Sequence, residues 1–585
     1  MTLDEFEPDN LLAEINRKLS NVSIFNTNPG EELDKSAFPT LKYHLYSEDP
    51  KKCFYGVQSL RRYLTQGTET NNVDDLLELN ILPQLKKLLC YHEETELQFE
   101  CAWIVTNIAA GTTEHTLALV EADFIPALLE CMTSKISTLT SKAQAAWALS
   151  NFAGESSNLR ELLMREDAIS TVAKVLEDAC NDILDTAIER SYHTGKVIIR
   201  DYDVCTDIKA LTWALSNMCR GGFRTADYWR MYIPAFKTLT RCITFDHKDI
   251  WIDSCWGLSR ILYNMHEVTP FYNTVNMPYE LCIRLTQLLK EENMSIIVPV
   301  LRSIINITSG LNEHTAVLLG TPLLNNLVSL TLPEVPVSIR RDSFLILANI
   351  AASDAELLQS LFNAPEIMNS VLAHICVPGH NYNEDNRTWY PTVSNAYYNL
   401  SEEWKITTES LWILCNLTNL GSDEAICALL GAHQEIPSSL IALLNHIDMP
   451  LTTCTKAIDV IINIIGRTNK ISTISSYSVN PYVQQFNESN LKEVLPALRK
   501  SFKSSDTLKD RCEVLRSLLE MPVHSTITSP KNLSASAASF GLQISSHMTT
   551  KANKRRLIRG MEDGDVRLIE NAVSSLCIDR SGSTQ

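Results

Sequence analysis

A tryptophan followed four residues later by an asparagine recurs along this sequence. The pairs are Trp103/Asn107, Trp147/Asn151, Trp213/Asn217 and Trp412/Asn416. Residues four apart lie on one face of a helix, so each pair would present an indole beside a carboxamide. An indole face attracts cations, and a carboxamide has a donor and an acceptor for the backbone of an extended peptide. The spacing therefore predicts a ladder of repeated sites for a long basic peptide.

The tryptophan position also defines a period. Related contexts that lack the indole continue the series, and the markers are Trp103, Trp147, Trp213, Trp256, Arg302, Leu345, Trp412 and Asp459, with Asn306, Asn349 and Asn463 each four residues after its marker. Most intervals are about 43 to 47 residues and two are about 66, and a period of 40 to 47 is typical of armadillo and HEAT arrays. The two long intervals predict insertions between helical units.

Composition limits the kinds of partner. The chain has 585 residues, and 45% of them are hydrophobic. This length exceeds that of one ordinary globular domain and, together with the repeats, favours a solenoid. It carries 69 acidic and 51 basic residues, for a formal net charge of -18. A negative surface repels nucleic acid and anionic lipid, so we expect cationic partners, no nucleic acid and no membrane.

Catalytic and metal-binding patterns are missing from the sequence. The 16 cysteines are scattered singly and form no zinc spacing, and the 13 histidines form no group with a nucleophile. No phosphate-binding glycine loop, Gly-x-Ser-x-Gly or His-Glu-x-x-His is present. We expect no enzyme activity, no cofactor, no metal and no catalytic residue. With no signal peptide and no apolar run of membrane length, we expect a protein of the cytoplasm and nucleus with reduced cysteines.

The chain divides into three predicted parts. Residues 1–45 form an acidic, turn-rich segment with eight Asp or Glu. Residues 46–522 form the solenoid, with polar loop insertions near 178–206 and 376–404. Residues 523–585 are rich in Ser, Thr and Ala, and we expect a flexible tail. Its basic cluster at 551–559 has three interpretations: a solvated tail, the protein's own localisation signal, or a pseudo-ligand for its own groove.

The residues around three markers resemble a known family. Leu97 to Thr113, Trp213 to Gly221 and Asp253 to Ser259 are similar to armadillo signatures of importin alpha, the adaptor that carries nuclear localisation signals. The similarity covers roughly residues 45 to 480. It implies an all-α fold, a right-handed armadillo-repeat superhelix of about ten repeats, whose third helices line a concave groove for extended basic peptides.

The resemblance also implies a major binding site. Its residues in this sequence would be Trp103, Asn107, Gly111, Thr116, Trp147, Asn151, Glu155, Trp213 and Asn217. Gly111 and Thr116 would stand at the dominant lysine position. The family has Asp where this chain has Glu155, which keeps the charge and adds a methylene.

A second, minor site is more eroded. Its residues would be Arg302, Asn306, Asp342, Asn349, Glu409, Trp412 and Asn416. Leu345 replaces an indole there. Between the two sites Arg260 stands where the family usually has a tyrosine, so that it either repels a cationic ligand or pairs with Asp253.

Family members that work with importin beta carry a basic N-terminal segment, and residues 1–45 contain none. The implied partners are proteins with basic localisation signals and an export receptor for recycling, with importin beta left open; a monomer is implied when the groove is occupied. The sequence thus favours a nuclear import adaptor. One alternative is a non-transport armadillo scaffold that tethers or sequesters a basic partner without importin beta, and a more remote one is a regulatory or adhesion-type scaffold with different ligands.

Overall fold

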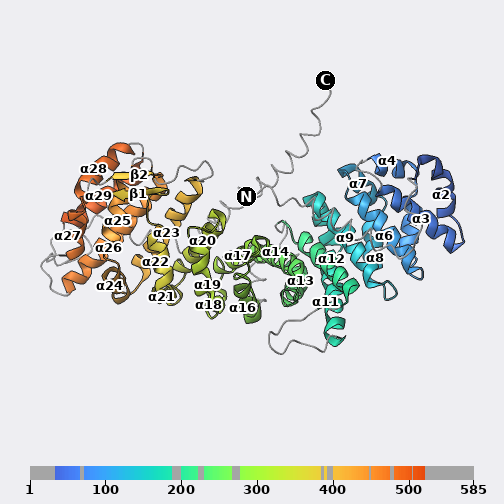
Figure 1. Ribbon diagram of the computed structural model, residues 1–585, viewed down its shortest axis with the longest axis horizontal. Coiled ribbons are helices and arrows are strands. Elements are labelled where there is room, and N and C mark those ends of the chain that lie inside the picture. The colour runs from blue at the N-terminus through green and yellow to red at the C-terminus, as the bar shows by residue number, and fades with distance from the viewer. Residues whose placement is uncertain are drawn as a thin grey trace, which may run out of the picture. The chain divides into compact units, whose positions relative to one another are not determined.

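The computed structural model describes residues 33–65, 71–186, 199, 201–221, 229–265, 277–383, 388–391, 400–446, 449–474, 480–502 and 505–520. These residues fall into two compact units. Unit 1 lies within Met1–Thr186 and Ile199–Met218, and unit 2 lies within Ala187–Ile198 and Cys219–Gln585. Both units are built of helices (Figure 1). The predicted tail, with its basic cluster at 551–559, lies outside the described residues.

The helices of each unit follow one another in short steps. Unit 1 contains η2 (Lys35–Ala37), α2 (Phe38–Leu45), α3 (Pro50–Leu64), α4 (Asn71–Glu78), α5 (Leu82–Leu89), α6 (Thr95–Ala109), α7 (Thr113–Glu121), α8 (Phe124–Thr133), α9 (Leu139–Glu155), α10 (Ser157–Arg165), α11 (Ala168–Thr186) and α12 (Tyr202–Met218). Unit 2 contains α13 (Trp229–Cys242), α14 (Lys248–Met265), α16 (Tyr279–Leu288), α17 (Met294–Thr308), α18 (Asn312–Leu319), α19 (Leu323–Val328), η4 (Ser329–Thr331), α20 (Val337–Ala351), α21 (Ala355–Phe362), α22 (Pro365–Ala373), β1 (His380–Asn383), β2 (Thr388–Pro391), α23 (Leu400–Leu420), α24 (Asp423–Ala432), α25 (Ile436–Leu444), α26 (Leu451–Ile474), α27 (Pro481–Glu488), α28 (Leu491–Ser501) and α29 (Asp506–Glu520).

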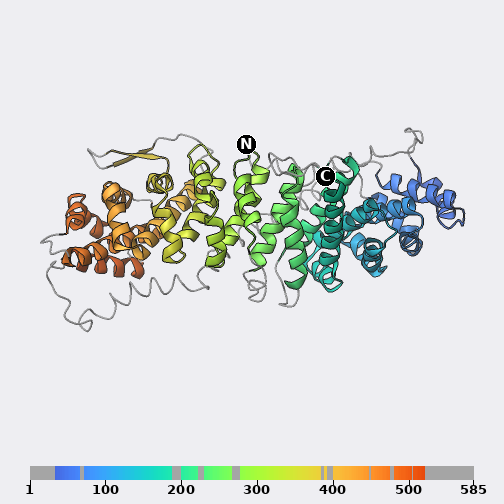
Figure 2. The same ribbon diagram turned by 90° about the horizontal axis from the view of Figure 1, so that it is seen from below.

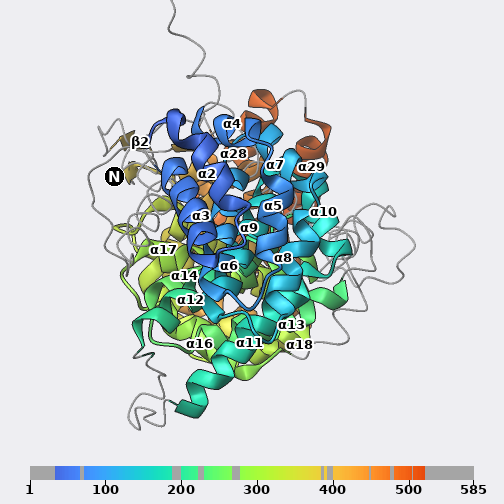
Figure 3. The ribbon, with the colours of Figure 1, turned by 90° about the vertical axis from the view of Figure 1, so that its right-hand side faces the viewer.

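One helix of each repeat packs on its counterpart in the next, and we call these the ladder helices. In unit 1 they are α3, α6, α9 and α12, and in unit 2 they are α14, α17, α20, α23, α26 and α29. A second layer, α5, α8 and α11, covers the ladder helices of unit 1, as the end view from α2 and α3 in Figure 3 helps to follow. The prediction of an all-α armadillo solenoid with about ten repeats is confirmed by these ten ladder helices among the described residues.

Polar residues at fixed places end and begin the helices. Thr112 caps α7 and accepts a hydrogen bond from the His115 N–H, while its own N–H donates to the His115 ring. Asn80, Asp123 and Asp167 all have left-handed backbone conformations, with φ of 54°, 58° and 55°, and each lies in the tight turn before α5, α8 or α11. Asn and Asp tolerate this conformation better than other non-glycine residues, so the turn recurs where a repeat has Asn or Asp at this position.

The first predicted boundary was wrong by several residues. Residues 38–45, assigned above to the acidic segment, form α2 and pack on α3. Phe38, Leu41 and Leu45 are buried on one side of that helix, because their spacing of three and four residues makes an apolar stripe. The short acidic stretch before it concealed this pattern.

Both insertions contain regular structure where polar loops were expected. α11 continues to Thr186, and its buried residues Ala179, Cys180 and Ile183 keep helical spacing inside the first insertion. In the second, β1 and β2 form an antiparallel hairpin in which Asn381 pairs with Tyr390. Figure 2 shows this hairpin at the edge of the helices of unit 2. Tyr382, Trp389 and Tyr390 favour strands, a preference that the surrounding polar residues masked.

Among the described residues, no single helix is long and apolar enough to cross a membrane. One bent pair, Asp423–Ala432 with Ile436–Leu444, passes that test by length and composition, with 77° between its helices. Both helices belong to the repeat before α26.

Because each repeat contacts only its neighbours, a core defect should act locally. Phe152 in α9 is fully buried, and Phe152→Ala should cost about 3 to 5 kcal/mol. Hydrogen exchange measured by mass spectrometry should show lost protection in α8, α9 and α10, with α20 and α23 unchanged. The matched change Phe344→Ala, at another fully buried position in α20, should give the reverse pattern. Equal loss in both units for either variant would contradict a locally stabilised solenoid.

Candidate functional site

The three tryptophans predicted for the major site lie on successive ladder helices of unit 1. Trp103 in α6 and Trp147 in α9 are 6% and 4% exposed, and Trp213 in α12 is half-buried. The rings of Trp147 and Trp213 meet edge to face, with centroids 5.6 Å apart and planes inclined by 65°. Adjacent repeats thus bring two of the three indoles into direct contact.

The face of Trp103 is covered by a cation from the preceding repeat. The guanidinium carbon of Arg61 in α3 lies 4.3 Å from the centroid of the ring. Arg61 Nε also donates to Glu100 Oε2 at 2.8 Å, and both side chains are largely buried. This cation-π contact fills the first indole position with an arginine of the chain itself.

The asparagines of the ladder link successive repeats. Asn151 Nδ2 donates to Thr106 O at 3.1 Å, Asn306 Nδ2 to Ser259 O at 2.8 Å, and Asn463 Nδ2 to Cys415 O at 3.1 Å. Asn349 Nδ2 points in the same way to Ile305 O at 3.5 Å and to Thr308 Oγ1 at 3.3 Å. In each case the backbone acceptor immediately precedes the equivalent position of the preceding ladder helix. One N–H of each carboxamide therefore holds the neighbouring repeat.

Two donors in unit 1 are left without a partner. Asn107 Nδ2 and Trp147 Nε1 are both covered and have no hydrogen-bond acceptor within the described part of the chain. A buried donor without an acceptor costs about 1 to 3 kcal/mol. An acceptor supplied from outside, after a small adjustment of these side chains, would recover part of that cost.

The residues predicted at the dominant lysine position follow α6. A Cβ on Gly111 would collide with Nδ1 of His115, so the ring of that histidine requires glycine here. Thr116 is fully buried, and its hydroxyl lies 3.2 Å from Thr112 O. Glu155, at the end of α9, accepts a hydrogen bond of 2.5 Å from the Thr113 hydroxyl. Glu155 has no cationic partner among the described residues.

The predicted minor site lies in unit 2, on α17, α20 and α23, and the carboxylate of Asp342 is paired there. Asp342 Oδ2 lies 3.2 Å from Arg302 Nε, and Asp342 Oδ1 lies 3.2 Å from Arg341 Nη2. Arg341 Nη1 also binds Glu402 Oε2 at 2.7 Å. Arg341 thus joins carboxylates from two ladder helices.

The indole of the minor site is also covered. Lys456 Nζ in α26 lies 3.4 Å from the centroid of the half-buried Trp412 ring. The same ammonium donates to Asp459 Oδ2 at 3.0 Å, and Arg511 Nε donates to Asp459 Oδ1 at 2.5 Å. Asn416, one turn after Trp412, is 5% exposed.

Arg260 lies against Trp256 in α14, with its guanidinium carbon 5.6 Å from the ring centroid. Burial lowers the pKa of Arg260 to about 9, and repulsion from Arg220 adds to this shift. Attraction to Asp253 opposes it. Arg260, the cation expected between the two predicted sites, therefore lies against Trp256 of its own helix.

Arg61, Arg341 and Lys456 were missed in the sequence, although two of them stand in phase with the ladder. Arg61 precedes Trp103, and Lys456 follows Trp412, by about one repeat length. Asp459 was chosen as the marker of its repeat, which concealed Lys456. An offset of one repeat from Trp412 reaches Lys456, whereas Arg61 lies 42 residues before Trp103, just short of the 43 to 47 residues of most intervals.

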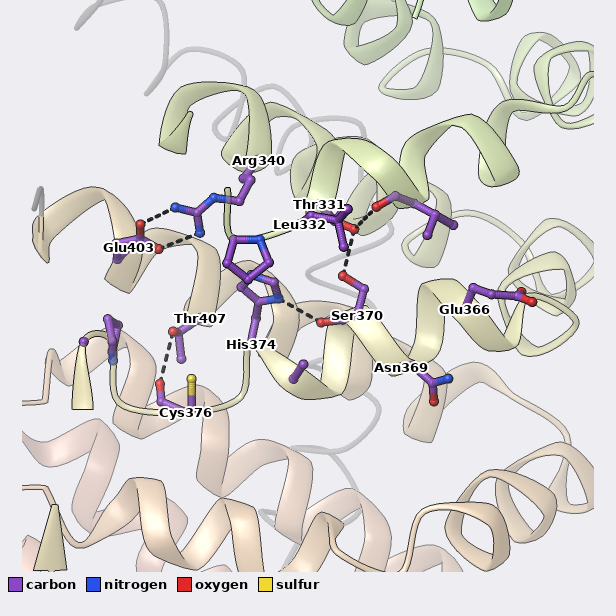
Figure 4. A pocket seen from close by; sticks show the side chains of 15 residues that line it. Thr331, Leu332, Arg340, Glu366, Asn369, Ser370, His374, Cys376, Glu403 and Thr407 are labelled. Carbon is purple, nitrogen blue, oxygen red and sulfur yellow. Dashed lines mark hydrogen bonds and ion pairs between the residues drawn. The ribbon is translucent and has the colours of Figure 1, made fainter. Parts of the chain in front are cut away.

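A separate pocket of about 490 Å³ opens in unit 2 among residues of α20, α22 and α23. Arg340 and Glu403 form a buried ion pair in its wall, and the His374 ring lies 2.8 Å from Ser370 O (Figure 4). Burial lowers the pKa of His374 and raises that of the Cys376 thiol to about 11. None of its lining residues belongs to the predicted ladder sites.

This chain is similar to several known proteins. The model of the armadillo/beta-catenin-like repeat matches residues 70–110. Importin subunit alpha-1a of Oryza sativa subsp. japonica is 24% identical over 335 residues, which are 57% of this chain and 58% of the relative. Importin subunit alpha-3 of Arabidopsis thaliana is 25% identical over 316 residues, 53% of this chain and 52% of the relative. The chain spans about half the length of the curated relatives it matches.

Among solved structures, an engineered protein is similar in fold, with a TM-score of 0.59 and 17% sequence identity. The match covers 84% of this chain and all of the engineered one. The helical repeats and the armadillo match define an armadillo-repeat protein. Within that class, the chain is similar to importin alpha subunits over about half of its length.

The raised pKa of Glu409 predicts a dependence of stability on pH. Burial raises it to about 7, although attraction to Arg341 opposes the shift. The folded state therefore binds this proton more tightly than the unfolded chain, whose glutamates titrate near pH 4.3. Protonation of Glu409 therefore adds to the free energy of unfolding. This contribution is complete below about pH 4.3 and is lost as the pH rises through 7. Glu409→Gln should remove this loss, as measured by urea unfolding of the full chain between pH 5 and 8.

Glu424→Gln is the control for this measurement. Hydrogen bonds from its own backbone N–H and from Ser422 lower the pKa of Glu424, so its shift has the opposite sign. In this variant the free energy of unfolding should still decline between pH 5 and 8, as in the wild type. A wild-type protein whose stability rises across that range, with no change in Glu409→Gln, would refute the assignment.

Proposed function

We propose that this chain is a nuclear import adaptor that binds an extended basic segment of the nuclear-localisation-signal type along α6, α9 and α12. The observation that carries the proposal is the pair of unpartnered donors, Asn107 Nδ2 and Trp147 Nε1, on neighbouring ladder helices. An extended peptide offers a backbone carbonyl at every residue, which is the acceptor that such donors need.

The charges of unit 1 support a cationic ligand. Glu155 accepts only a neutral hydroxyl among the described residues, so its carboxylate keeps most of its attraction for an ammonium or guanidinium group. The half-buried indole of Trp213, which Trp147 contacts edge to face, offers apolar surface to the stem of a lysine or arginine, as well as attraction to its charge. The net charge of -18 would steer a basic partner toward the protein, more weakly at high salt.

The names of the relatives supply the biological context. They are importin alpha subunits, so the proposal includes movement between cytoplasm and nucleus, cargo with basic signals and an export receptor for recycling, with importin beta left open. A non-transport scaffold that tethers a basic partner uses the same ladder and differs only in lacking importin beta.

A fluorescent peptide with the pattern Lys-Arg-x-Lys should bind the full-length protein, and Trp147→Ala with Asn151→Ala should weaken it at least about tenfold. Fluorescence anisotropy at two salt concentrations measures the affinity, with a glutamine-substituted peptide as control. Asn463→Ala, in α26 of unit 2, is the matched protein control, because it loses the same kind of bond to the preceding ladder helix, also 3.1 Å long. Equal loss in both variants would assign the effect to repeat packing and reject the site.

A pull-down with purified importin beta separates the two candidate functions. An import adaptor should retain importin beta and the basic peptide together in one complex. Peptide binding without importin beta, across a range of concentrations, would instead support the scaffold. Absence of peptide binding would reject both.

A further inference from the structure

The predicted major site in unit 1 and the predicted minor site in unit 2 differ in the intrachain contacts of their charged and aromatic side chains. In unit 2 one arginine, Arg341, bridges Asp342 in α20 and Glu402 in α23, at 3.2 and 2.7 Å. Glu409, one of the predicted ligands for a cation, also feels the charge of Arg341. Two carboxylates from neighbouring ladder helices are therefore bound by a guanidinium that belongs to the chain.

Trp412 has an intrachain cation as well. Lys456 is 6% exposed, and its ammonium lies 3.4 Å from the indole centroid and 3.0 Å from Asp459 Oδ2. Asp459 is 2% exposed and is also held by Arg511. A lysine of the ligand would have to displace Lys456 from the Trp412 indole, and the buried Lys456 ammonium would lose that cation-π contact.

Unit 1 offers the contrast. Arg61 covers Trp103 in the same way, at 4.3 Å, but the next two helices show no such occupant. Within the described residues no cation lies over the ring of Trp147 or Trp213, and none pairs with Glu155. We therefore call the part of the ladder from α9 to α12 the open segment, because no cation of the described residues covers its indoles.

Tethering decides the competition between an internal and an external cation. A side chain fixed within the fold faces its site at an effective concentration in the millimolar range or above. An external lysine gains the same contacts that it displaces, so it gains little net free energy and must order itself as well. Internal cations of this kind close a site to basic ligands.

We propose that Arg341 and Lys456 are built-in occupants of the ladder in unit 2, which confine a basic peptide to unit 1 and give one binding site per chain. Arg61 marks the end of the open segment in unit 1. This inference rests on the proposed function, since it concerns which part of the same ladder receives the ligand.

Calorimetric titration of the full-length protein with the Lys-Arg-x-Lys peptide tests the inference. The wild type should bind one peptide, and Arg341→Gln with Lys456→Gln should bind two, the second with a Kd within about tenfold of the first. A gain of binding cannot result from unfolding. Arg340→Gln is the matched control, because Arg340 lies next to Arg341 in α20 and its buried ion pair with Glu403 of α23 is in the pocket wall of Figure 4. This variant should still bind one peptide.

Hydrogen exchange of the wild type gives a second readout that needs no variant. The peptide should protect α6, α9 and α12 and leave α20, α23 and α26 unchanged. Two peptides per wild-type chain, protection of α20 to α26, or a folded double variant that still binds one peptide would each overturn the inference and leave the proposed function standing. Absence of any binding to the wild type would reject the proposed function itself.

Discussion

The hydrogen bond from a ladder asparagine to the preceding ladder helix sets the relation between neighbouring repeats. Asn151, Asn306 and Asn463 each donate to a backbone carbonyl at the same relative position one repeat earlier. Apolar packing between parallel helices leaves their axial offset loosely defined, whereas a polar group on a short side chain has one acceptor within reach. The bond therefore fixes the register at which indoles and charges of adjacent helices face each other.

Charged residues also pair across repeats, and they do so at a place where the ladder asparagine makes no such bond: Asn107 Nδ2 in α6 has no acceptor within the described part of the chain. Arg61 reaches Glu100 and Trp103 on the next ladder helix, and Arg341 reaches Glu402 on the next. Each ion pair lies in partly dry surroundings, where loss of one partner costs more than the pair contributes. The spacing that suits an external lysine also suits a basic residue of the adjacent repeat, so a small change of sequence exchanges one for the other.

The ladder was predictable from the sequence because its signal is local and repeated. Trp147 and Asn151 fix the face of their own helix, and the period fixes which helices follow. The partners of the ladder were not predictable in the same way. Whether Lys456 lies on Trp412 depends on the offset between two helices, which no single helix encodes. The helix α2 and the hairpin of β1 and β2 were missed because short apolar or aromatic patterns lay within polar surroundings.

The acceptor of the asparagine bond is a main-chain carbonyl. Every helix supplies that group whatever its side chains, so the donor repeat places no demand on the sequence of the repeat before it. A helical repeat held in this way can be duplicated, deleted or replaced, and the hydrogen bond between neighbouring repeats can still form. The specificity of the surface can then evolve independently of the joint that holds the array together.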